Sequence, residues 1–443
     1  MVMTSGNVSE EPNAKDNDEA VERLGRIADF FLEHNRDIFA KYDDSVCLVE
    51  KDVPRVVRRA RGYAPYPIPL PFESRPVLAC GAEEKNTFCL TRDRHAFVSQ
   101  HIGDMENEET LQHFEKTIDL YRRLFRIEPE AVACDLHPEY LPTKYARRLA
   151  AGNSRLRLVP VQHHHAHIAS CLVENAARVP AGQPVIGVAF DGTGFGVDGT
   201  IWGGEFLVAD LAGSRRVGHL ECVPMPGGAA AVRKPYRMAL GYLLALLGPD
   251  YPLHGLPLLG PLETGELVVV GRQVERRVNS PLTSSAGRLF DAVSALAGVR
   301  GEVDYEAQAA IELEMLAEGD ARESRTYPFT LAEQDGCRVV QLGELVAAVA
   351  EDVKDGAGAG AVSTRFHWTM ARMIVEVGRA VSGDTGIGVV ALSGGVFQNR
   401  LLFGLAVDGL REAGLEVLTH RLVPCNDGGV SLGQAAVAGF AGA

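Results

Sequence analysis

Paired cysteines, long apolar runs and an excess of positive charge are all missing from this sequence. Its 8 cysteines are scattered and none forms a Cys-x-x-Cys pair, which excludes a disulfide framework and favours a reducing compartment. No apolar run reaches the length that a membrane span needs. The formal net charge of −14 argues against sequence-independent binding to a nucleic-acid backbone. We therefore expect a cytoplasmic protein that binds neither membrane nor nucleic acid.

The 443 residues suffice for more than one domain, and short apolar runs alternate with helical patterns along most of the chain. This alternation predicts an α/β fold. The proline-rich run 65–71 predicts an extended linker between domains. We expect an N-terminal segment with this linker at 1–72, a first lobe at 73–183, and a second lobe with a helical insert at 184–443.

A histidine cluster at 163–167 lies between an apolar strand pattern and a helical pattern. His163 and His167 are four residues apart, so on a helix they share one face and could bind one metal ion. Neutral imidazole is a common ligand of zinc and iron. The same pair could also belong to a solvated face or to a satisfied core. A complete site needs further ligands.

Two aspartates supply candidates for the remaining ligands. Asp191 ends an apolar strand pattern, where ligands of open α/β sheets gather, although an Asp before Gly is also a common turn residue. Asp427 precedes two glycines and a helix, which by itself favours a helix N-cap. Together with His163 and His167, they form a hypothetical site of two imidazoles and two carboxylates that suits iron or zinc.

Glycine-rich turns form a second group of candidates. We expect Gly192, Thr193 and Gly194 in a glycine-rich hairpin that runs from Gly192 to Thr200, and Gly394 and Gly395 in a turn after a strand. Backbone N–H groups exposed by such turns can bind phosphate, although glycine often only permits a tight turn. Gly287 to Asp291 opens a further helix. Three such turns in one cleft would hold a nucleotide. Lys85 lies in another expected turn, where an exposed side chain is the simpler interpretation.

These motifs together resemble the HypF family of hydrogenase-maturation carbamoyltransferases. The resemblance covers nearly the whole chain and is carried by VQHHHAHIASC, FDGTGFGVDGTIWGGE, GRLFDAVSALAG, ALSGGVFQNRLL, CNDGGVSLGQA, GAEEKNTFCL, SQHIGD and DLHPEY. It implies a TsaD-like domain with the two-lobed fold of actin and the sugar kinases. The segment around Ser5 and Asn7 resembles the end of a YrdC-like domain. The acylphosphatase domain, the zinc modules and most of the YrdC-like domain of this family have no counterpart here.

The resemblance also implies a reaction. In this family, carbamoyl phosphate and ATP give carbamoyl adenylate, and the carbamoyl group passes to the C-terminal cysteine of the partner HypE on the route to cyanide ligands of a nickel–iron centre. It implies His163, His167, Asp191 and Asp427 as ligands of a divalent iron or zinc ion, the first three also being catalytic. By position, Lys85 and the glycine-turn residues would bind ATP or carbamoyl adenylate; the latter are Gly192, Thr193, Gly194, Gly287, Asp291, Gly394, Gly395 and Asn399.

Three alternatives stay open. The chain could be an O-carbamoyltransferase that acts on a small-molecule hydroxyl. It could be a tRNA threonylcarbamoyltransferase, although the acidic charge and the dense His cluster argue against this. It could also be a fragment that binds nucleotide and HypE without full activity.

Overall fold

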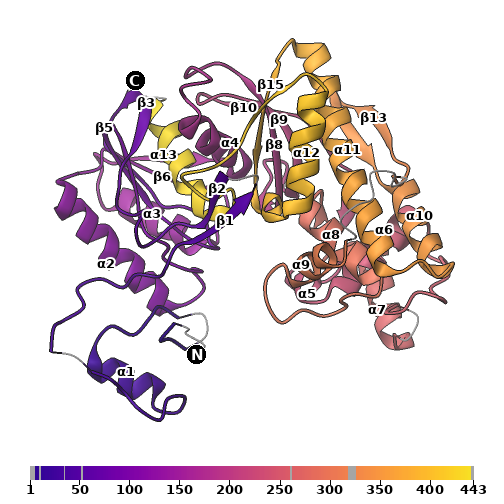
Figure 1. Ribbon diagram of the computed structural model, residues 1–443, viewed down its shortest axis with the longest axis horizontal. Helices are drawn as coiled ribbons and strands as arrows, with labels where there is room; N and C mark the ends of the chain where they lie inside the picture. Colours follow the sequence, from indigo (N-terminus) through magenta and orange to yellow (C-terminus); the bar gives the residue numbers. More distant parts are fainter. Residues whose placement is uncertain are drawn as a thin grey trace. The chain divides into compact units, whose positions relative to one another are not determined.

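A computed structural model describes residues 5–8, 11–33, 35–50, 53–259, 262–317 and 326–440 (Figure 1). Two compact units are present. The first comprises 1–183, 210–213 and 419–443, and the second comprises 184–209 and 214–418. The C-terminal 25 residues thus pack with the first unit rather than with the residues that precede them. The three predicted domains and their two boundaries stay a prediction.

The first unit is built on a five-stranded sheet with the strand order β3-β5-β4-β6-β7. Its elements are α1 (Asn17–Leu24), β1 (Val46–Glu50), β2 (Val53–Arg58), β3 (Ile68–Ser74), β4 (Val77–Ala79), β5 (Cys89–Val98), α2 (Glu108–Phe125), β6 (Ala131–Asp135), α3 (Leu141–Ala151), β7 (Arg157–Val161), α4 (His163–Glu174), the short 3-10 helix η2 (Asp427–Gly429) and α13 (Val430–Phe440). Strands β4, β6 and β7 run parallel, and β5 is antiparallel to its two neighbours.

Helices cover both faces of this sheet. Alternate residues of β4 and β6, such as Leu78 and Val132, pack against Phe114 and Ile118 of α2 in one continuous apolar core. Helices α13 and α4 pack on each other, and α13 also contacts the strands from β3 to β7 (Figure 1). The central strands β4 and β6 are therefore buried on both faces, as their near-continuous apolar sequence requires.

The crossing of α4 and α13 is unusually close. A Cβ atom on Gly433 of α13 would lie 1.8 Å from the carbonyl oxygen of Ala166 in α4, so no residue larger than glycine fits there. This crossing brings the start of α13, and η2 just before it, to the N-terminal turn of α4, with which η2 is in contact.

The run at 65–71 is extended over residues 68–71, as predicted, and its role as a linker between domains stays a prediction. Residues 68–71 form the first part of β3, which pairs antiparallel with β5 at the edge of the sheet. Ile68, Leu70 and Phe72 are buried, and the prolines alternate with them on the other face. Proline has no N–H to donate and is tolerated in edge strands, so this composition is compatible with a strand as well as with a linker.

The second unit contains a nine-stranded sheet. Its elements are β8 (Val185–Phe195), β9 (Ile201–Ala209), β10 (Ser214–Leu220), β11 (Val223–Pro224), α5 (Ala229–Arg233), α6 (Pro235–Leu246), α7 (Thr264–Arg276), β12 (Leu282–Thr283), α8 (Ala286–Leu296), α9 (Gln308–Met315), β13 (Thr330–Gln334), β14 (Cys337–Gln341), α10 (Gly343–Lys354), α11 (Ala359–Thr385), β15 (Val389–Ser393), the 3-10 helix η1 (Gly395–Gln398), α12 (Arg400–Glu412) and β16 (Glu416–Leu418). The main strand order is β13-β14-β10-β9-β8-β15-β16, and β11 and β12 pair beside β9.

The glycine-rich hairpin predicted over 192–200 is present, but its turn begins after Gly194. Strand β8 continues to Phe195 and pairs antiparallel with β9, with a shift of register between Phe190 and Gly194. The turn itself follows at 196–200, where the N–H of Gly196 donates to the Thr200 carbonyl. The glycines at 192 and 194 therefore lie in an irregular part of a strand and not in a tight turn. Within the part of the chain that the structure describes, no helix has both the length and the apolar character to span a bilayer.

We expect Gly433→Ala to destabilise the first unit by about 2 kcal/mol, because the new methyl group must push α13 away from α4. Gly271→Ala in α7 is the matched control, since open space surrounds its Cβ position and alanine favours a helix. Urea denaturation of both variants measures the effect. Equal stability of the Gly433→Ala variant and the unaltered chain would contradict the packing argument.

Candidate functional site

The first unit brings three of the four predicted metal ligands together. His163 is the first residue of α4, whose N-cap Gln162 accepts the N–H of His165 at 2.8 Å. His167 follows one turn later on the same face, and Asp427 begins η2. The Asp427 Oδ1 atom lies 3.5 Å from His163 Nε2 and 3.4 Å from His167 Nε2. One ligand atom from each of these residues lies within 4.8 Å of the others.

A buried carboxylate orients the first imidazole. Asp135, the last residue of β6, accepts a hydrogen bond from His163 Nδ1 at 2.8 Å, and neither side chain is exposed. The other Asp135 oxygen accepts the backbone N–H of His137 at 2.9 Å. Because the carboxylate accepts, Nδ1 carries the proton and Nε2 presents its lone pair towards Asp427. A carboxylate–histidine pair of this kind typically stands behind a metal ligand.

The other two histidines of the cluster have different contacts. His165 Nε2 donates to the carbonyl of Asp210 at 2.7 Å, and burial lowers the pKa of His165, so this ring is neutral. His164 is fully buried, and its Nδ1 lies 3.1 Å from the amide nitrogen of Gln162. Only one pair of the cluster therefore faces Asp427, and it is the pair that the four-residue spacing predicts.

Sequence reasoning missed Asp135 as a functional residue. The signals were its position at the C-terminal end of a short buried strand, which it shares with many structural aspartates, and its place at the start of the motif DLHPEY. Its role becomes visible only when β6 and α4 lie side by side, because 28 residues separate it from His163.

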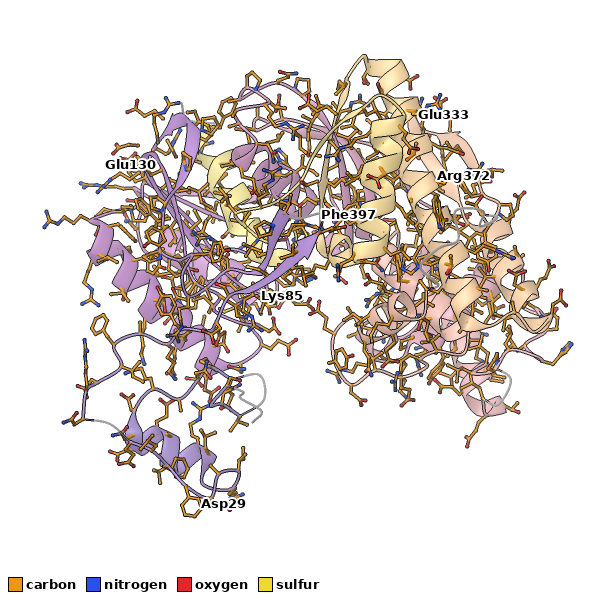
Figure 2. All side chains as sticks on the ribbon, viewed as in Figure 1. Asp29, Lys85, Glu130, Glu333, Arg372 and Phe397 are labelled. Atoms are coloured by element: carbon orange, nitrogen blue, oxygen red, sulfur yellow. The ribbon has the colours of Figure 1, made fainter. Side chains whose placement is uncertain are left out.

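Lys85 belongs to the first unit and not to the glycine segments (Figure 2). It has a left-handed backbone with φ of 46°, and its N–H donates to Asp104 Oδ1 at 2.6 Å. A Cβ on Gly428 would lie 3.6 Å from the Lys85 carbonyl oxygen, so this turn lies next to the segment that carries Asp427. Its predicted role in nucleotide binding stays a prediction.

A cavity of about 1010 Å³ is formed by the N-terminal segment of the first unit. Four cations line it, together with two aspartates and Ser5; the cations are Lys15, Lys41, Arg58 and Arg61. Asn7 donates its side-chain amide to the carbonyls of Val8 and Glu11. Next to the cavity, the buried Arg59 donates to the carbonyls of Val98, Tyr63 and Tyr66 and thereby connects this segment to β5.

In the second unit, three glycine-bearing segments meet around Asp191. Asp191 Oδ1 accepts the N–H of Gly192 at 2.8 Å and the N–H of Gly395 at 3.2 Å. A Cβ on Gly287 would lie 2.9 Å from the Cα of Gly192, and one on Gly394 would lie 2.1 Å from the Phe190 carbonyl oxygen. Glycine is thus required where the three backbones touch. Thr193 is exposed and donates to the Gly192 carbonyl, whereas Gly194 is buried.

Asp291 lies on helix α8, one turn beyond Gly287. Burial raises the pKa of Asp291 to about 6, although Arg288, with Nη2 at 3.0 Å from Asp291 Oδ2, opposes this rise. Both side chains are less than a tenth exposed. The pair therefore places a carboxylate of unusually high proton affinity beside the close contact of Gly287 with Gly192.

Asn399 has two structural partners. Its Oδ1 accepts the N–H of Leu402 as the N-cap of α12, and its Nδ2 lies 2.8 Å from His367 Nε2. His367 Nδ1 lies 2.8 Å from the Ser363 carbonyl and must donate to it, which leaves Nε2 to accept from Asn399. These contacts determine the orientation of the Asn399 amide.

The comparisons agree with this architecture. A model of the second subdomain of the carbamoyltransferase Kae1-like domain matches residues 187–434, and a HypF Kae1-like domain model matches 72–174. A Sua5/YciO/YrdC model, described as telomere recombination, matches 1–60. A tRNA N6-adenosine threonylcarbamoyltransferase from Thermus thermophilus is 29% identical to this chain. The match covers 43% of this chain and 61% of that protein.

Relatives and solved structures extend the match to almost the whole chain. Carbamoyltransferase HypF2 from Cupriavidus necator is 40% identical over 99% of this chain and 56% of its own length, and HypF from Synechocystis sp. is 37% identical over 98% and 56%. A full-length HypF in a phosphate- and nucleotide-bound form superposes with a TM-score of 0.91, at 44% identity, over 98% of this chain and 66% of that one. HypF from T. kodakarensis gives 0.88 at 33% identity, over 98% and 57%.

The fold and the matches define a mixed α/β protein with a Kae1-like domain, preceded by a YrdC-like segment. The chain belongs to the HypF carbamoyltransferase family. The predicted family and fold class are confirmed. The chain spans about half the length of the curated relatives that it matches.

We expect the second unit to lose stability in acid through His367. Burial lowers the pKa of His367 to about 4, whereas the unfolded chain binds this proton near pH 6.5. Above pH 6.5 the free energy of unfolding does not depend on the protonation of His367. It falls by up to about 3 kcal/mol as the pH decreases from 6.5 towards 4, because the unfolded chain binds this proton more readily than the folded chain. Urea denaturation between pH 7.5 and 4.5 should show a smaller pH dependence for His367→Gln. Identical pH dependence in both proteins would contradict this.

Proposed function

We propose that this chain is the carbamoyl-transfer part of a HypF-type enzyme of nickel–iron hydrogenase maturation. It would transfer a carbamoyl group from carbamoyl adenylate to the C-terminal cysteine thiol of HypE, on the route to the cyanide ligands. Family membership supports this proposal. The observation that carries it is the convergence of two imidazole Nε2 atoms on one carboxylate in the first unit, with the first imidazole oriented by a buried aspartate.

The donor set of the first unit fits a divalent metal ion. Both Nε2 atoms face Asp427 Oδ1 at about the same distance, and two neutral imidazoles with one carboxylate are ordinary ligands for zinc or iron. We propose His163, His167 and Asp427 as ligands, and we propose Asp191 of the second unit as the fourth on the basis of the family motif. When bound, the metal would supply Lewis-acid polarisation of a substrate oxygen.

The second unit is proposed to bind the nucleotide. Support comes from the backbone segments around Asp191, which approach one another as closely as glycine permits. The proposed binding residues are Gly192, Thr193, Gly194, Gly287, Asp291, Gly394, Gly395 and Asn399, with Lys85 contributed by the first unit. Because Asp191 Oδ1 accepts the N–H groups of Gly192 and Gly395, those two donors serve to shape the segment rather than to bind phosphate directly.

The proposed reaction is an acyl transfer. The HypE thiolate attacks the carbamoyl carbon, a C–S bond forms, the bond from that carbon to the phosphate oxygen breaks, and AMP leaves with the electron pair. The thiol proton passes to solvent before the attack. The residues of this chain would orient the carbamoyl group and exclude water, so that the thiolate attacks in place of hydroxide.

The formation of carbamoyl adenylate from carbamoyl phosphate and ATP is proposed only for the complete enzyme. Relatives in this family are nearly twice as long as this chain. The cavity of the N-terminal segment, with its four cations, is compatible with a phosphate-bearing substrate. Because this polypeptide spans only about half of its relatives' length, we expect it by itself to require pre-formed carbamoyl adenylate.

An assay with two carbamoyl donors tests the proposal. We expect the chain to carbamoylate HypE when given pre-formed carbamoyl adenylate, and not when given carbamoyl phosphate and ATP. Mass spectrometry of HypE detects the gain of one carbamoyl group, and HypE without its C-terminal cysteine is the control. Binding of ATP and HypE without any transfer would support the alternative of a binding fragment.

We expect His167→Ala to abolish both metal retention and carbamoyl transfer, because the ion would lose one of three ligands in the first unit. His165→Gln is the matched control: it lies on the same helix, is also buried, and can still donate to the Asp210 carbonyl. Elemental analysis after dialysis measures the metal, with the circular dichroism spectrum as a test of folding. Full metal occupancy in a folded His167→Ala variant would contradict the proposed ligand set.

A further inference from the structure

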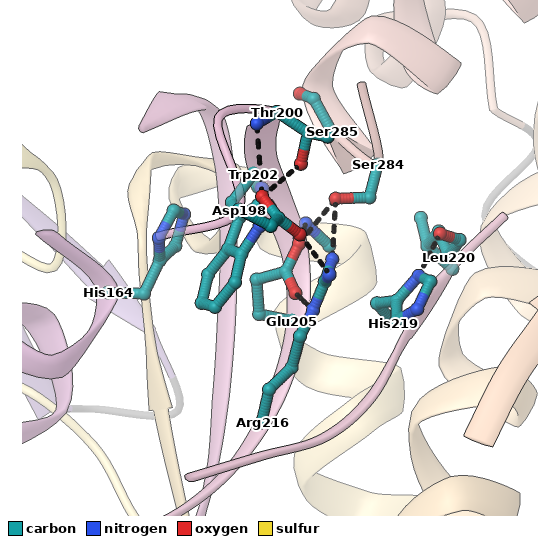
Figure 3. Close-up of polar contacts among 12 residues, drawn as sticks. His164, Asp198, Thr200, Trp202, Glu205, Arg216, His219, Leu220, Ser284 and Ser285 are labelled. Atoms are coloured by element: carbon teal, nitrogen blue, oxygen red, sulfur yellow. Dashed lines mark hydrogen bonds and ion pairs between the residues drawn. The ribbon is translucent and has the colours of Figure 1, made fainter. Parts of the chain in front are cut away.

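An ion pair between the buried Glu205 and the partly buried Arg216 lies next to the segment that carries Asp191. Glu205 on β9 is completely buried and accepts hydrogen bonds from four groups (Figure 3). Its Oε1 accepts the N–H groups of Gly203 and Gly204 at 3.2 and 3.3 Å and the hydroxyl of Ser284 at 2.5 Å. Its Oε2 accepts Nε of Arg216 at 2.6 Å. A buried carboxylate that accepts this many hydrogen bonds has a fixed position and orientation.

Arg216 of β10 extends this contact in two directions. Its Nη2 donates to the Ser284 hydroxyl oxygen at 3.2 Å, and its Nη1 lies 3.2 Å from Asp198 Oδ2 (Figure 3). Its guanidinium lies over the Trp202 ring, 4.2 Å from the centroid. Asp198 in turn accepts from Thr200 and Trp202. The guanidinium is thus held on both its edge and its face, and it fixes the position of Ser284 together with Glu205.

Ser284 is adjacent to the residue that holds the Asp191 segment. Ser285, the N-cap of α8, directs its hydroxyl to the carbonyl oxygens of Asp191 and Gly192, each at 2.8 Å. The backbone segments around Ser284 and Asp191 pack so closely that no side chain fits between them. A Cβ on Gly204 would lie 2.4 Å from the Ser284 carbonyl oxygen, and one on Gly203 would lie 2.6 Å from that of Asp191. A shift of Ser284 must therefore move Ser285 and the two carbonyls that it holds.

We infer that Glu205 and Arg216 are positioning residues for the nucleotide site of the second unit. They act through Ser284 and Ser285 on the backbone of Asp191 and Gly192, and they touch neither nucleotide nor reacting atoms. This inference rests on the proposed function of that site. A buried ion pair contributes little net stability compared with an apolar pair of the same shape, whereas it holds its neighbours in one geometry. Removal of one partner also lowers stability, because the other charge is left unpaired, so ligand affinity is measured on variants that are folded under the assay conditions.

Three variants test the inference by calorimetric titration with ATP in the presence of magnesium. Glu205→Gln keeps an acceptor for the glycine N–H groups but turns an amide towards Arg216, and we expect about tenfold weaker ATP binding. Ser284→Ala removes only the hydroxyl that links the pair to the turn, and it should weaken binding several-fold. Arg216→Lys retains the charge with a single donor group and should have an intermediate effect.

Glu266→Gln is the matched control. It removes the carboxylate of another partly buried ion pair in the same unit, with Arg237, between α7 and α6. We expect it to lose stability in urea without a change in ATP affinity. ATP affinities of Glu205→Gln and Ser284→Ala equal to that of the unaltered chain would overturn the inference and leave the proposed function standing. Failure of the unaltered chain to bind ATP would overturn both.

Discussion

The contact of Gly433 with the Ala166 carbonyl is the constraint on which the first unit depends. It lets α13 lie directly on α4, and so places the 3-10 helix before α13 at the N-terminal turn of the histidine helix. Asp427 thereby meets His163 and His167, although more than 250 residues separate them in the chain. Packing at a single glycine and the chemistry of the proposed metal site are consequences of the same crossing.

In the second unit, polar contacts hold together the backbone segments around Asp191. Backbone segments from β8, α8 and the start of η1 approach one another as closely as glycine allows around Asp191. Close packing of this kind leaves peptide groups without regular sheet partners, and the single proton of the Ser285 hydroxyl is shared between the Asp191 and Gly192 carbonyls. The buried Glu205–Arg216 pair then holds the neighbouring Ser284. Rigid support of a binding segment reduces the cost of ordering it when a ligand binds.

Sequence patterns predicted most of the candidate site but not its supports. Helical spacing singled out His163 and His167, the pair that faces Asp427 in the structure, and Asp427 itself was a candidate from its position before two glycines. The role of Asp135 was missed because the motif DLHPEY gave no sign of which residue it would contact. Glu205 and Arg216 were missed because each would be unremarkable on a strand, and their importance comes from mutual contact. The exact strand ends within 65–71 and 192–200 could not be predicted, because proline and glycine permit several backbone states, among which the sheet selects.

By itself, the sequence determined the local periodicities, the candidate side chains of the site and the family, because these depend on neighbouring residues and on motif composition. Tertiary structure alone decided that residues 419–443 return to the first unit, that Asp135 supports His163, and that Ser285 captures the Asp191 and Gly192 carbonyls. Each of these depends on contacts between residues far apart in the chain, and such contacts are selected by packing and by the need to satisfy buried polar groups.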